Sequence, residues 1–358
     1  MEFLSDYGLF LAKVATVVVA VLILITAIVS AAQKDRGDQH GDGELRTRKL
    51  NDRYRRLKES LQSRLMDDEQ RKQWEKSEKK RRKAEQKAQK QHAKAAGHTP
   101  QDADERKPRV FVLDFHGDIK ASDTDMLRQS VTSVLSVAEA GKDEVVVRLE
   151  SGGGLVHSYG LAAAQLDRIR NRNINLTVCV DKVAASGGYM MACVADRIIA
   201  SPFAILGSIG VVAQLPNFHR LLKKNDVDFE VLTAGEHKRT LTVFGENTDK
   251  GRQKFLDDLE DTHVLFKEYV GERRPGLDIA AVSNGDIWFG KRALDVHLID
   301  EVMTSDEYLE SACDRADVIV VGFHHKRSLA ERLGFAASTA VEQSFWRIVG
   351  TFRNQNIQ

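Results

Sequence analysis

The sequence predicts an α/β protein that is attached to a membrane near its N-terminus. Three observations lead to this prediction: an uncharged apolar run near the start, a strongly charged segment after it, and strand-like runs that alternate with helical patterns further on. We therefore expect four parts. They are a membrane anchor at 1–33, a charged helical stalk and linker at 34–108, a globular α/β domain at 109–325 and an amphipathic segment at 326–358.

The apolar run consists of 20 uncharged residues, Val14 to Gln33. At about 1.5 Å per residue, a helix of this length spans the roughly 30 Å hydrocarbon layer of a bilayer. A cleaved signal peptide is the alternative, because residues 30–32 are small. Secretory signals have a basic start and an apolar core of about 7–15 residues, whereas this chain begins with the acids Glu2 and Asp6 and has a longer run. We expect a retained single-span helix.

The charged segment between Leu45 and Lys94 holds 19 Lys and Arg and 8 Asp and Glu. Five apolar residues at spacings of three and four predict a helix with one apolar stripe: Leu50, Tyr54, Leu57, Leu61 and Leu65. A solvated helical stalk is the simplest interpretation. Its bases could also bind anionic lipid head groups, and RNA is disfavoured because no aromatic residues are interleaved in the basic run at 76–94. Since the whole chain has a net charge of only +1, it is not a general nucleic-acid-binding polycation.

The globular part begins at Arg109 with alternating strand and helix patterns. The strand-like runs are 110–115, 144–150, 174–180 and 197–201, and the helical patterns are 123–140, 156–170 and 188–195. This alternation predicts a largely parallel sheet with right-handed crossovers. In such sheets, ligands usually bind beyond the carboxyl ends of the strands.

Two glycine-rich turns fall at that edge of the predicted sheet. The sequence SGGG (151–154) follows the second strand, and Ser186-Gly187-Gly188 follows the third. The small residues around Ser186 could serve only close packing of helix and strand. Alternatively, Ser186 is a nucleophile, and the other turn supplies backbone N–H groups for an oxyanion hole.

A serine nucleophile requires a base, and the sequence alone does not assign one. The histidines of the globular part, His116, His157 and His237, have no carboxylate partner that can be identified from spacing. The three cysteines, Cys179, Cys193 and Cys313, are an odd number at no metal-binding or CxxC spacing, so neither a disulfide framework nor a zinc site is expected.

Three longer stretches carry a family resemblance: DKVAASGGYMMACVADRIIASPFAILGSIGVV (181–212), TAGEHKRTLT (233–242) and GDIWFGKRALDVHLIDEV (285–302). Over nearly the whole chain, the sequence resembles the signal peptide peptidase A family of serine proteases. The resemblance implies a Clp protease/crotonase-like fold, a spiral of βαβ units with a flanking sheet, and makes residues 109–325 the catalytic domain. It also implies a serine–lysine dyad, no cofactor and no metal.

Matched to the family motifs, Ser186 is the nucleophile, Lys238 is the general base, and Ser208 hydrogen-bonds the lysine amine. This chemistry requires a neutral lysine; an exposed lysine has a pKa near 10.4, which burial lowers. Lys182, four residues before Ser186, is a disfavoured alternative base, because Asp181 and solvent would keep it charged.

The resemblance assigns the oxyanion donors to the backbone N–H of Gly153 or Gly154 together with that of Gly187. One departure from the family pattern lies in this turn. Where the family commonly has proline, in SPGG, this chain has Gly152. The loss of the fixed proline φ makes the unfolded loop more flexible, but both candidate donor glycines remain.

The resemblance favours an endopeptidase that cleaves extended apolar polypeptides such as signal-peptide remnants or misfolded membrane proteins. It also implies a homo-oligomer, most simply an octamer, with the segment from Ser328 to Arg353 near the ring surface or the membrane. No nucleic-acid partner is expected. Two other classes stay open: a crotonase-type acyl-CoA enzyme, and a non-catalytic membrane scaffold that would tolerate the loss of Ser186.

The side of the bacterial inner membrane on which the domain lies is a first testable prediction. One base, Lys13, precedes the apolar run, whereas six lie within residues 34–53: Lys34, Arg36, Arg46, Arg48, Lys49 and Arg53. The positive-inside rule therefore predicts a cytoplasmic domain, although the resemblance implies work on the periplasmic face. Alkaline phosphatase fused after Lys107 should be inactive and β-galactosidase active. The opposite pair of results would place the domain in the periplasm.

Overall fold

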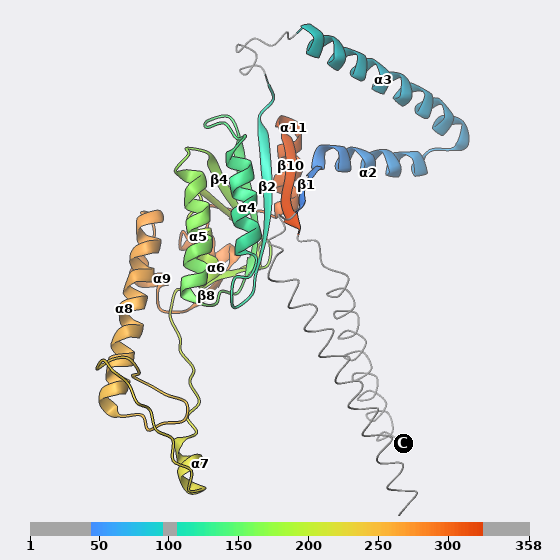
Figure 1. Cartoon of the computed structure of the whole chain (residues 1–358). Helices are drawn as coiled ribbons and strands as arrows, with labels where there is room; N and C mark the ends of the chain where they lie inside the picture. The colour runs from blue at the N-terminus through green and yellow to red at the C-terminus, as the bar shows by residue number, and fades with distance from the viewer. Residues whose placement is uncertain (1–43, 96–105, 325–358) are drawn as a thin grey trace, which may run out of the picture. The chain divides into compact units, whose positions relative to one another are not determined.

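A largely parallel β-sheet organises the chain in the computed structural model, which describes residues 44–95 and 106–324 (Figure 1). Its main strand order is β1-β10-β2-β3-β4-β6-β9. In that order, the strands are Glu44–Lys49, Asp317–His324, Arg109–Gly117, Glu144–Ser151, Asn175–Val180, Arg197–Ala200 and Glu301–Val302. From β10 to β9 every neighbouring pair is parallel. The predicted mixed α/β fold is thus confirmed.

A short branch of three strands extends from the end of β3. β5 (Val183–Ala185) pairs parallel with β3 and with β7 (Ile205–Gly207), and β7 pairs antiparallel with β8 (Ile287–Phe289). The sequence analysis did not predict these strands, because three residues are too few to show a periodic pattern. The branch carries both serines that the family motifs single out.

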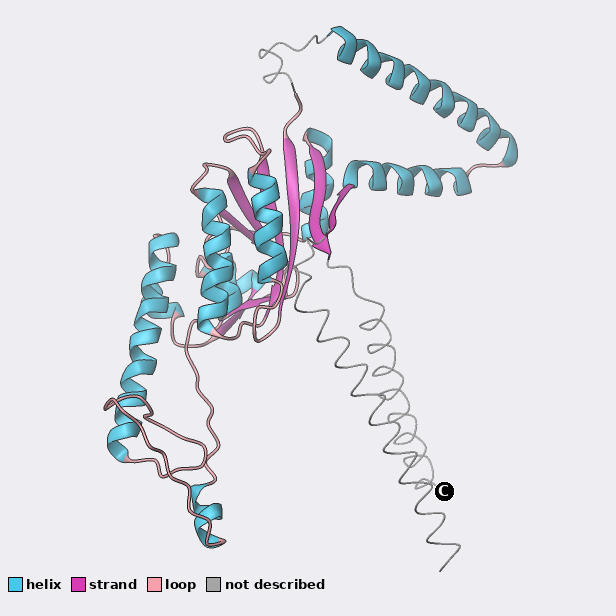
Figure 2. Cartoon of the chain, in the orientation of Figure 1, coloured by secondary structure: helices cyan, strands magenta, loops and turns pink. Residues whose placement is uncertain are grey.

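The two faces of the sheet are covered by different helices (Figure 2). Alternate strand residues such as Phe111 and Val145 pack in one core with α4 (Thr124–Leu135), α5 (Val156–Arg170) and α6 (Gly187–Ala192). Their neighbours, such as Val112 and Val146, pack in a second core with α11 (Ser305–Arg315). Burial on both faces explains why these strands read as continuous apolar runs.

The predicted elements of the domain match the observed ones closely. The helix at 156–170 has the predicted bounds, whereas the pattern at 123–140 ends as a helix at Leu135 and the pattern at 188–195 ends at Ala192. Four further helices follow: α7 (His219–Lys224), α8 (Asp249–Arg273), α9 (Ile279–Val282) and α10 (Gly290–Asp295).

The charged segment is helical beyond Lys49, as the apolar stripe predicts, but it begins with a strand that was not predicted. Its first residues form β1, and the helices α2 (Leu50–Leu65) and α3 (Asp68–Ala95) follow. The start of α2 is fastened to the domain: the Asn51 amide donates to the carbonyls of Cys313 and Ala316 at 3.0 and 2.9 Å and accepts from the Val318 N–H at 2.8 Å. The stalk is therefore docked at its beginning.

Among residues 44–95 and 106–324, no helix is both long and apolar enough to cross a membrane. The predicted anchor, Val14 to Gln33, and the predicted amphipathic segment, Ser328 to Arg353, lie outside the described residues. Both stay predictions.

A buried carboxylate, Asp143, joins the start of β2 to the turn before β3. It accepts hydrogen bonds from the guanidinium groups of Arg106 and Arg109 at 2.7–2.8 Å, and from the backbone N–H groups of Arg109 and Glu139. Burial opposes its ionisation, but these donors outweigh burial and hold the pKa of Asp143 well below its ordinary value. The ion cluster therefore stabilises the fold wherever Asp143 is ionised.

Replacing Asp143 by asparagine should lower the free energy of unfolding by about 3 kcal/mol at pH 7, because two arginines lose a buried partner. A depressed native pKa contributes stability that is complete above the unfolded pKa of about 3.9 and is lost as the pH falls through the native value. Urea midpoints of wild type and Asp143→Asn should therefore approach each other as the pH falls below about 3.9, and should meet only below the native pKa of Asp143.

The matched control is Asp125→Asn, which removes an exposed ion pair with Arg128 (3.3 Å). It should cost less than about 1 kcal/mol. Equal destabilisation by the two variants would show that the Asp143 cluster has no special importance.

Candidate active site

Ser186 lies between a strand and a helix, in a backbone conformation that is unusual for a residue with a side chain. β5 ends at Ala185, α6 begins at Gly187, and Ser186 has φ 52° and ψ −119°. Its N–H donates to the Gly207 carbonyl at 2.8 Å, and its carbonyl accepts from the Met190 N–H at 2.9 Å. A strained serine at a strand-to-helix turn is a typical arrangement for a nucleophile.

Ser208 lies at the same edge of the sheet as Ser186. The residues before the two serines, Ala185 and Gly207, are register partners in the parallel pair of β5 and β7. Ser208 also has a positive φ (50°), and its N–H donates to the Asp286 carbonyl at 2.6 Å. The structure thus brings these two predicted site residues together, both half-buried.

The glycine turn at 151–154 lies directly against the start of α6. At Gly153, which has φ 88°, a Cβ would lie 2.7 Å from the Ser186 Cβ and 2.8 Å from the Gly187 nitrogen. A Cβ at Gly188 would lie 2.5 Å from the Ser151 carbonyl oxygen. Real Cβ atoms do not come so close to other atoms, so the contact requires glycine on both sides.

Hydrogen bonding distinguishes the candidate oxyanion donors. The Gly153 N–H donates to the Ser151 hydroxyl at 3.1 Å. Within the part of the chain that the structure describes, the N–H groups of Gly154 and Gly187 donate to no other group. Gly154 and Gly187 are therefore the pair free to bind a developing oxyanion, and Gly153 keeps the turn close to Ser186.

Two supporting residues, Tyr159 and Ser151, were missed by the sequence analysis. The buried Tyr159 hydroxyl donates to the Asp118 carbonyl at 2.7 Å and lies 2.6 Å from the Ser151 hydroxyl, which in turn accepts from Gly153. A Cβ at Gly187 would lie 2.4 Å from the Tyr159 ring. Burial raises the pKa of Tyr159, so the phenol stays a donor. The signal available in the sequence was a polar ring on the apolar side of the helix at 156–170.

Lys238 lies in a different environment, in the stretch without helix or strand between α7 and α8. Its N–H donates to the Gly235 carbonyl, and its side chain is exposed. Among the described residues, no hydrogen bond joins Lys238 to either serine. The single chain therefore does not bring the predicted base to the predicted nucleophile.

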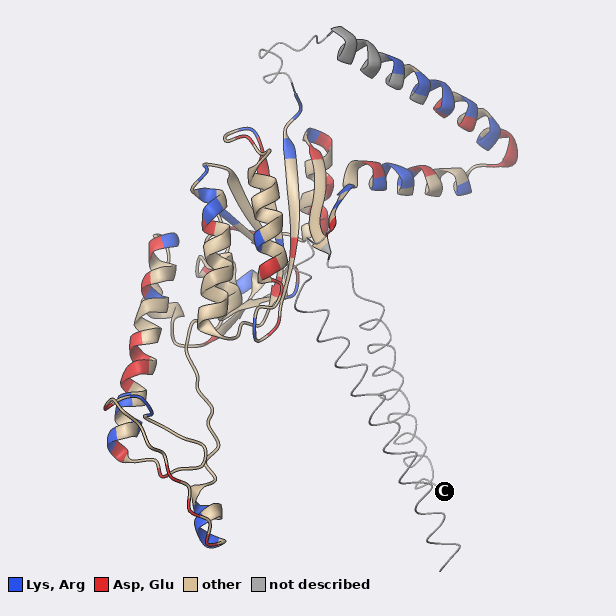
Figure 3. Ribbon diagram, viewed as in Figure 1, with Lys and Arg blue, Asp and Glu red and all other residues tan. Residues whose placement is uncertain are grey.

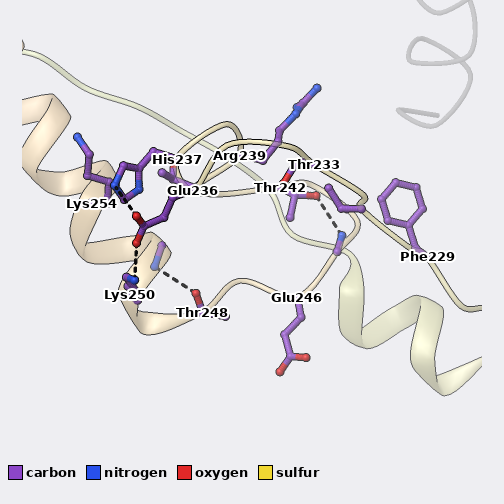
Figure 4. Close-up of a pocket in the computed structure, with 14 residues that line it drawn as sticks. Phe229, Thr233, Glu236, His237, Arg239, Thr242, Glu246, Thr248, Lys250 and Lys254 are labelled. Carbon is purple, nitrogen blue, oxygen red and sulfur yellow. Dashed lines mark hydrogen bonds and ion pairs between the residues drawn. The ribbon is translucent and has the colours of Figure 1, made fainter.

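The loop that carries Lys238 is held against the first turns of α8 beside a cavity of about 310 Å³ (Figure 4). The Glu236 carboxylate pairs with the Lys250 ammonium at 2.7 Å. Thr240 approaches the helix so closely that a Cβ at Gly251 would lie 2.3 Å from the Thr240 carbonyl oxygen. Two contacts thus fix the loop while leaving Lys238 accessible.

The other candidate groups are placed less favourably for catalysis. The Lys182 ammonium forms an ion pair with Glu150 at 2.9 Å, and the imidazole of His116 lies 3.9 Å from the same carboxylate. Burial raises the pKa of the Cys193 thiol to about 12 and that of the Cys313 thiol to about 11, so neither thiol forms a thiolate near neutral pH. Within the described ranges, no group of three His, Cys, Asp or Glu side chains is arranged to hold a metal ion.

Comparison with known proteins gives matches over most of the chain. Two family models match in succession: "Peptidase family S49 N-terminal" at residues 2–166 and "Peptidase family S49" at residues 168–319. The chain is 49% identical over 333 residues to "Probable protease SohB" of Haemophilus influenzae, which covers 93% of this chain and 92% of the relative.

A second relative of that name, from Buchnera aphidicola subsp. Schlechtendalia chinensis, is 47% identical over 311 residues, or 87% of this chain and 100% of the relative. Among solved structures, a mutant of the membrane-bound stomatin-specific protease 1510-N matches with a TM-score of 0.38 at 16% identity, covering 57% of this chain and 84% of that chain.

The contact between Gly153 and Ser186 generates a prediction about catalysis. Gly153→Ala should lower the rate of Ser186 acylation on the order of 100-fold, as the loss of an oxyanion donor does, because the new Cβ pushes the turn away from Gly187. Gly152→Ala is the matched control: no atom lies within 4 Å of its added Cβ. Both rates are measured by labelling with a fluorophosphonate in reactions quenched at successive times. Equal rates in the two variants would contradict a role of the Gly153 contact in acylation.

Proposed function

Because the chain belongs to peptidase family S49, we propose that it is a membrane-anchored serine endopeptidase with Ser186 as nucleophile and Lys238 as general base. The family confirms the resemblance found in the sequence and makes the protein a protease. The proposal also includes the dyad, the substrate, the Clp protease/crotonase-like spiral, the anchor and the inner-membrane location. The observation that carries it is the strained Ser186 packed against a glycine turn, with the free N–H groups of Gly154 in that turn and Gly187 at the start of α6.

The proposed reaction has two steps. Neutral Lys238 takes the proton of the Ser186 hydroxyl while the oxygen attacks the peptide carbonyl carbon, and the N–H groups of Gly154 and Gly187 bind the oxyanion. Lys238 then gives the proton to the leaving amine as the peptide C–N bond breaks. In the second step, water gives a proton to Lys238 and attacks the ester carbon. Lys238 then returns this proton to the Ser186 oxygen as the ester C–O bond breaks, which regenerates both the serine hydroxyl and the neutral amine.

This mechanism requires Lys238 to approach Ser186 and lose contact with water, since burial favours the neutral amine. We propose that a neighbouring copy supplies this cover in a homo-oligomer, expected to be an octamer. An exposed apolar pair supports the assembly, because contiguous exposed apolar surface commonly marks an interface. Phe203 is 83% exposed and packs edge-to-face against Phe289, which is 43% exposed, with ring centroids 6.3 Å apart.

The proposed substrate is an extended, largely apolar polypeptide, such as a signal-peptide remnant or a misfolded membrane protein. An extended peptide can add as a strand at an edge of the sheet, and alternate side chains then enter pockets. An acyl-CoA enzyme would need neither Lys238 nor an anchor. A non-catalytic scaffold would need no reactive serine, so labelling of Ser186 separates it from the protease.

The dyad gives a direct mutational prediction. Ser186→Ala and Lys238→Ala should each abolish casein cleavage and fluorophosphonate labelling while the thermal unfolding midpoint is kept, and Ser208→Ala should weaken both activities. The acylation rate of the wild type should rise with pH, as expected for catalysis by a general base. These rates and midpoints are measured on the detergent-solubilised full chain.

Lys182→Ala is the matched control, because it removes a lysine at the end of β4 that is paired with Glu150. It should retain at least half of the activity, as expected for loss of an exposed ion pair. Full activity in Lys238→Ala would refute the dyad, whatever the control shows.

A further inference from the structure

The apolar stripe of α2 is continuous, but the domain covers only its beginning. Leu50 is 2% exposed and packs with Tyr54 in the second core beside α11. The next three members of the stripe are open: Leu57 is 57% exposed, Leu61 61% and Leu65 78%. Residues three and four apart lie on one face of a helix, so these leucines form a single row that continues past the edge of the domain.

Basic side chains border this row on both sides. Helical spacing places Arg53 and Arg64 along one side of the leucines and Lys58 along the other, whereas the acids Asp52 and Glu59 project from the opposite face. Within the described residues, none of these three bases has an ion-pair partner. Arg55, which lies outside the border, is paired with Asp52 at 2.6 Å. Figure 3 shows the Lys and Arg residues along α2 and α3.

We propose that this face of α2 lies in the surface of an anionic bilayer, with Leu57, Leu61 and Leu65 inserted at the level of the head groups and Arg53, Lys58 and Arg64 bound to lipid phosphates. An apolar row flanked by bases is the pattern of a helix that lies in the membrane surface, and long basic side chains reach the phosphates beside it. This inference rests on the proposed membrane anchor.

Charge distinguishes a bilayer from the other possible occupants of the row. A second copy of α2 would bring the same bases against Arg53, Lys58 and Arg64. The segment at 325–358 holds five basic and two acidic residues, so it is also basic. Only an anionic surface complements the borders of the row.

Chain length is consistent with the proposed contact. Sixteen residues, 34–49, separate the predicted span from α2. Extended chain covers up to about 3.3 Å per residue, so α2 can lie at the surface of the membrane that the anchor crosses. Because Asn51 fastens the start of α2 to α11 and β10, a surface-bound α2 would also set the orientation of the domain toward the bilayer.

Lipid-dependent fluorescence of the full chain tests this inference. Leu61→Cys and, as the matched control on the opposite face, Ser63→Cys are each made together with Cys313→Ser and labelled with an environment-sensitive dye. The proteins are reconstituted in phosphatidylcholine vesicles with or without about 30% phosphatidylglycerol. We expect spin-labelled lipid head groups to quench the dye at position 61 at least about twofold more than the dye at 63, and only with the anionic lipid.

A charge variant tests the contribution of the bases. Arg53→Gln, Lys58→Gln and Arg64→Gln together should reduce the quenching at position 61 to the value at position 63, as should about 0.5 M salt. The control is the double variant Arg55→Gln and Arg56→Gln, whose residues lie outside the border. It should retain most of the quenching at position 61.

Three outcomes would overturn the inference. One is equal quenching at positions 61 and 63. Another is a dye at position 61 that is shielded from water in detergent and loses this shielding when the protein is diluted, which indicates a second copy. The third is shielding in detergent that disappears when the chain is cut after His324, which indicates the C-terminal segment. Flotation of the chain with vesicles tests the anchor, and labelling of Ser186 tests the peptidase, so either part of the proposed function can fail separately.

Discussion

The turn at 151–154 lies so close to the start of α6 that neither segment can carry a side chain where they meet. This contact sets the geometry around Ser186: Gly153 lies against Ser186 and the Gly187 nitrogen, and its N–H donates a hydrogen bond to the Ser151 hydroxyl. Tyr159 supports the contact, because its ring fills the space beside Gly187 and its hydroxyl is hydrogen-bonded to the Ser151 hydroxyl. A site built from backbone groups depends on such supports, since no rotamer change can correct a misplaced amide.

The proposed nucleophile and its neighbours are positioned within one chain, whereas the proposed base is not brought to them. Ser186 and Ser208 are set by strands that pair inside the domain. Lys238 is carried by a loop that contacts α8 at Lys250 and Gly251 and also contacts Asn217 and Phe218, just before α7. In the proposed mechanism, an isolated subunit would therefore be poorly active, and assembly would itself switch on proteolysis where the protein accumulates.

Sequence predicted the central elements because their signals are local and strong. The apolar runs of β2 and β3 are buried on both faces, and α5 has a full helical period, so its bounds were correct. β5 and β7 were missed because their extended form comes from pairing with neighbours. The strand Glu44–Lys49 was read as helix for the same reason, since its charged residues show no strand pattern. Pairing partners distant in the sequence decide such segments.

The candidate site was likewise predictable only in part. The glycine turns and Ser186 were identified from their position after predicted strands, and the choice of Gly154 over Gly153 needed the hydrogen bond from Gly153 to Ser151. The role of Tyr159 was not visible, because a tyrosine on an apolar helix face is read as core. The surroundings of Lys238 depend on a stretch with no periodic pattern, so spacing could not place it.

The position of β10 between β1 and β2 has a consequence for how the protein is made. The Asn51 side chain that fastens α2 finds its partners 262–267 residues later in the chain. At about 5–20 residues per second, a ribosome needs tens of seconds to synthesise that interval. During that interval β2 lies at an open edge of the sheet, and the start of α2 lacks the residues to which it binds. Nascent chains stalled before Asp317 would therefore expose an unpaired strand that chaperones can bind, and completion of the last strand closes it.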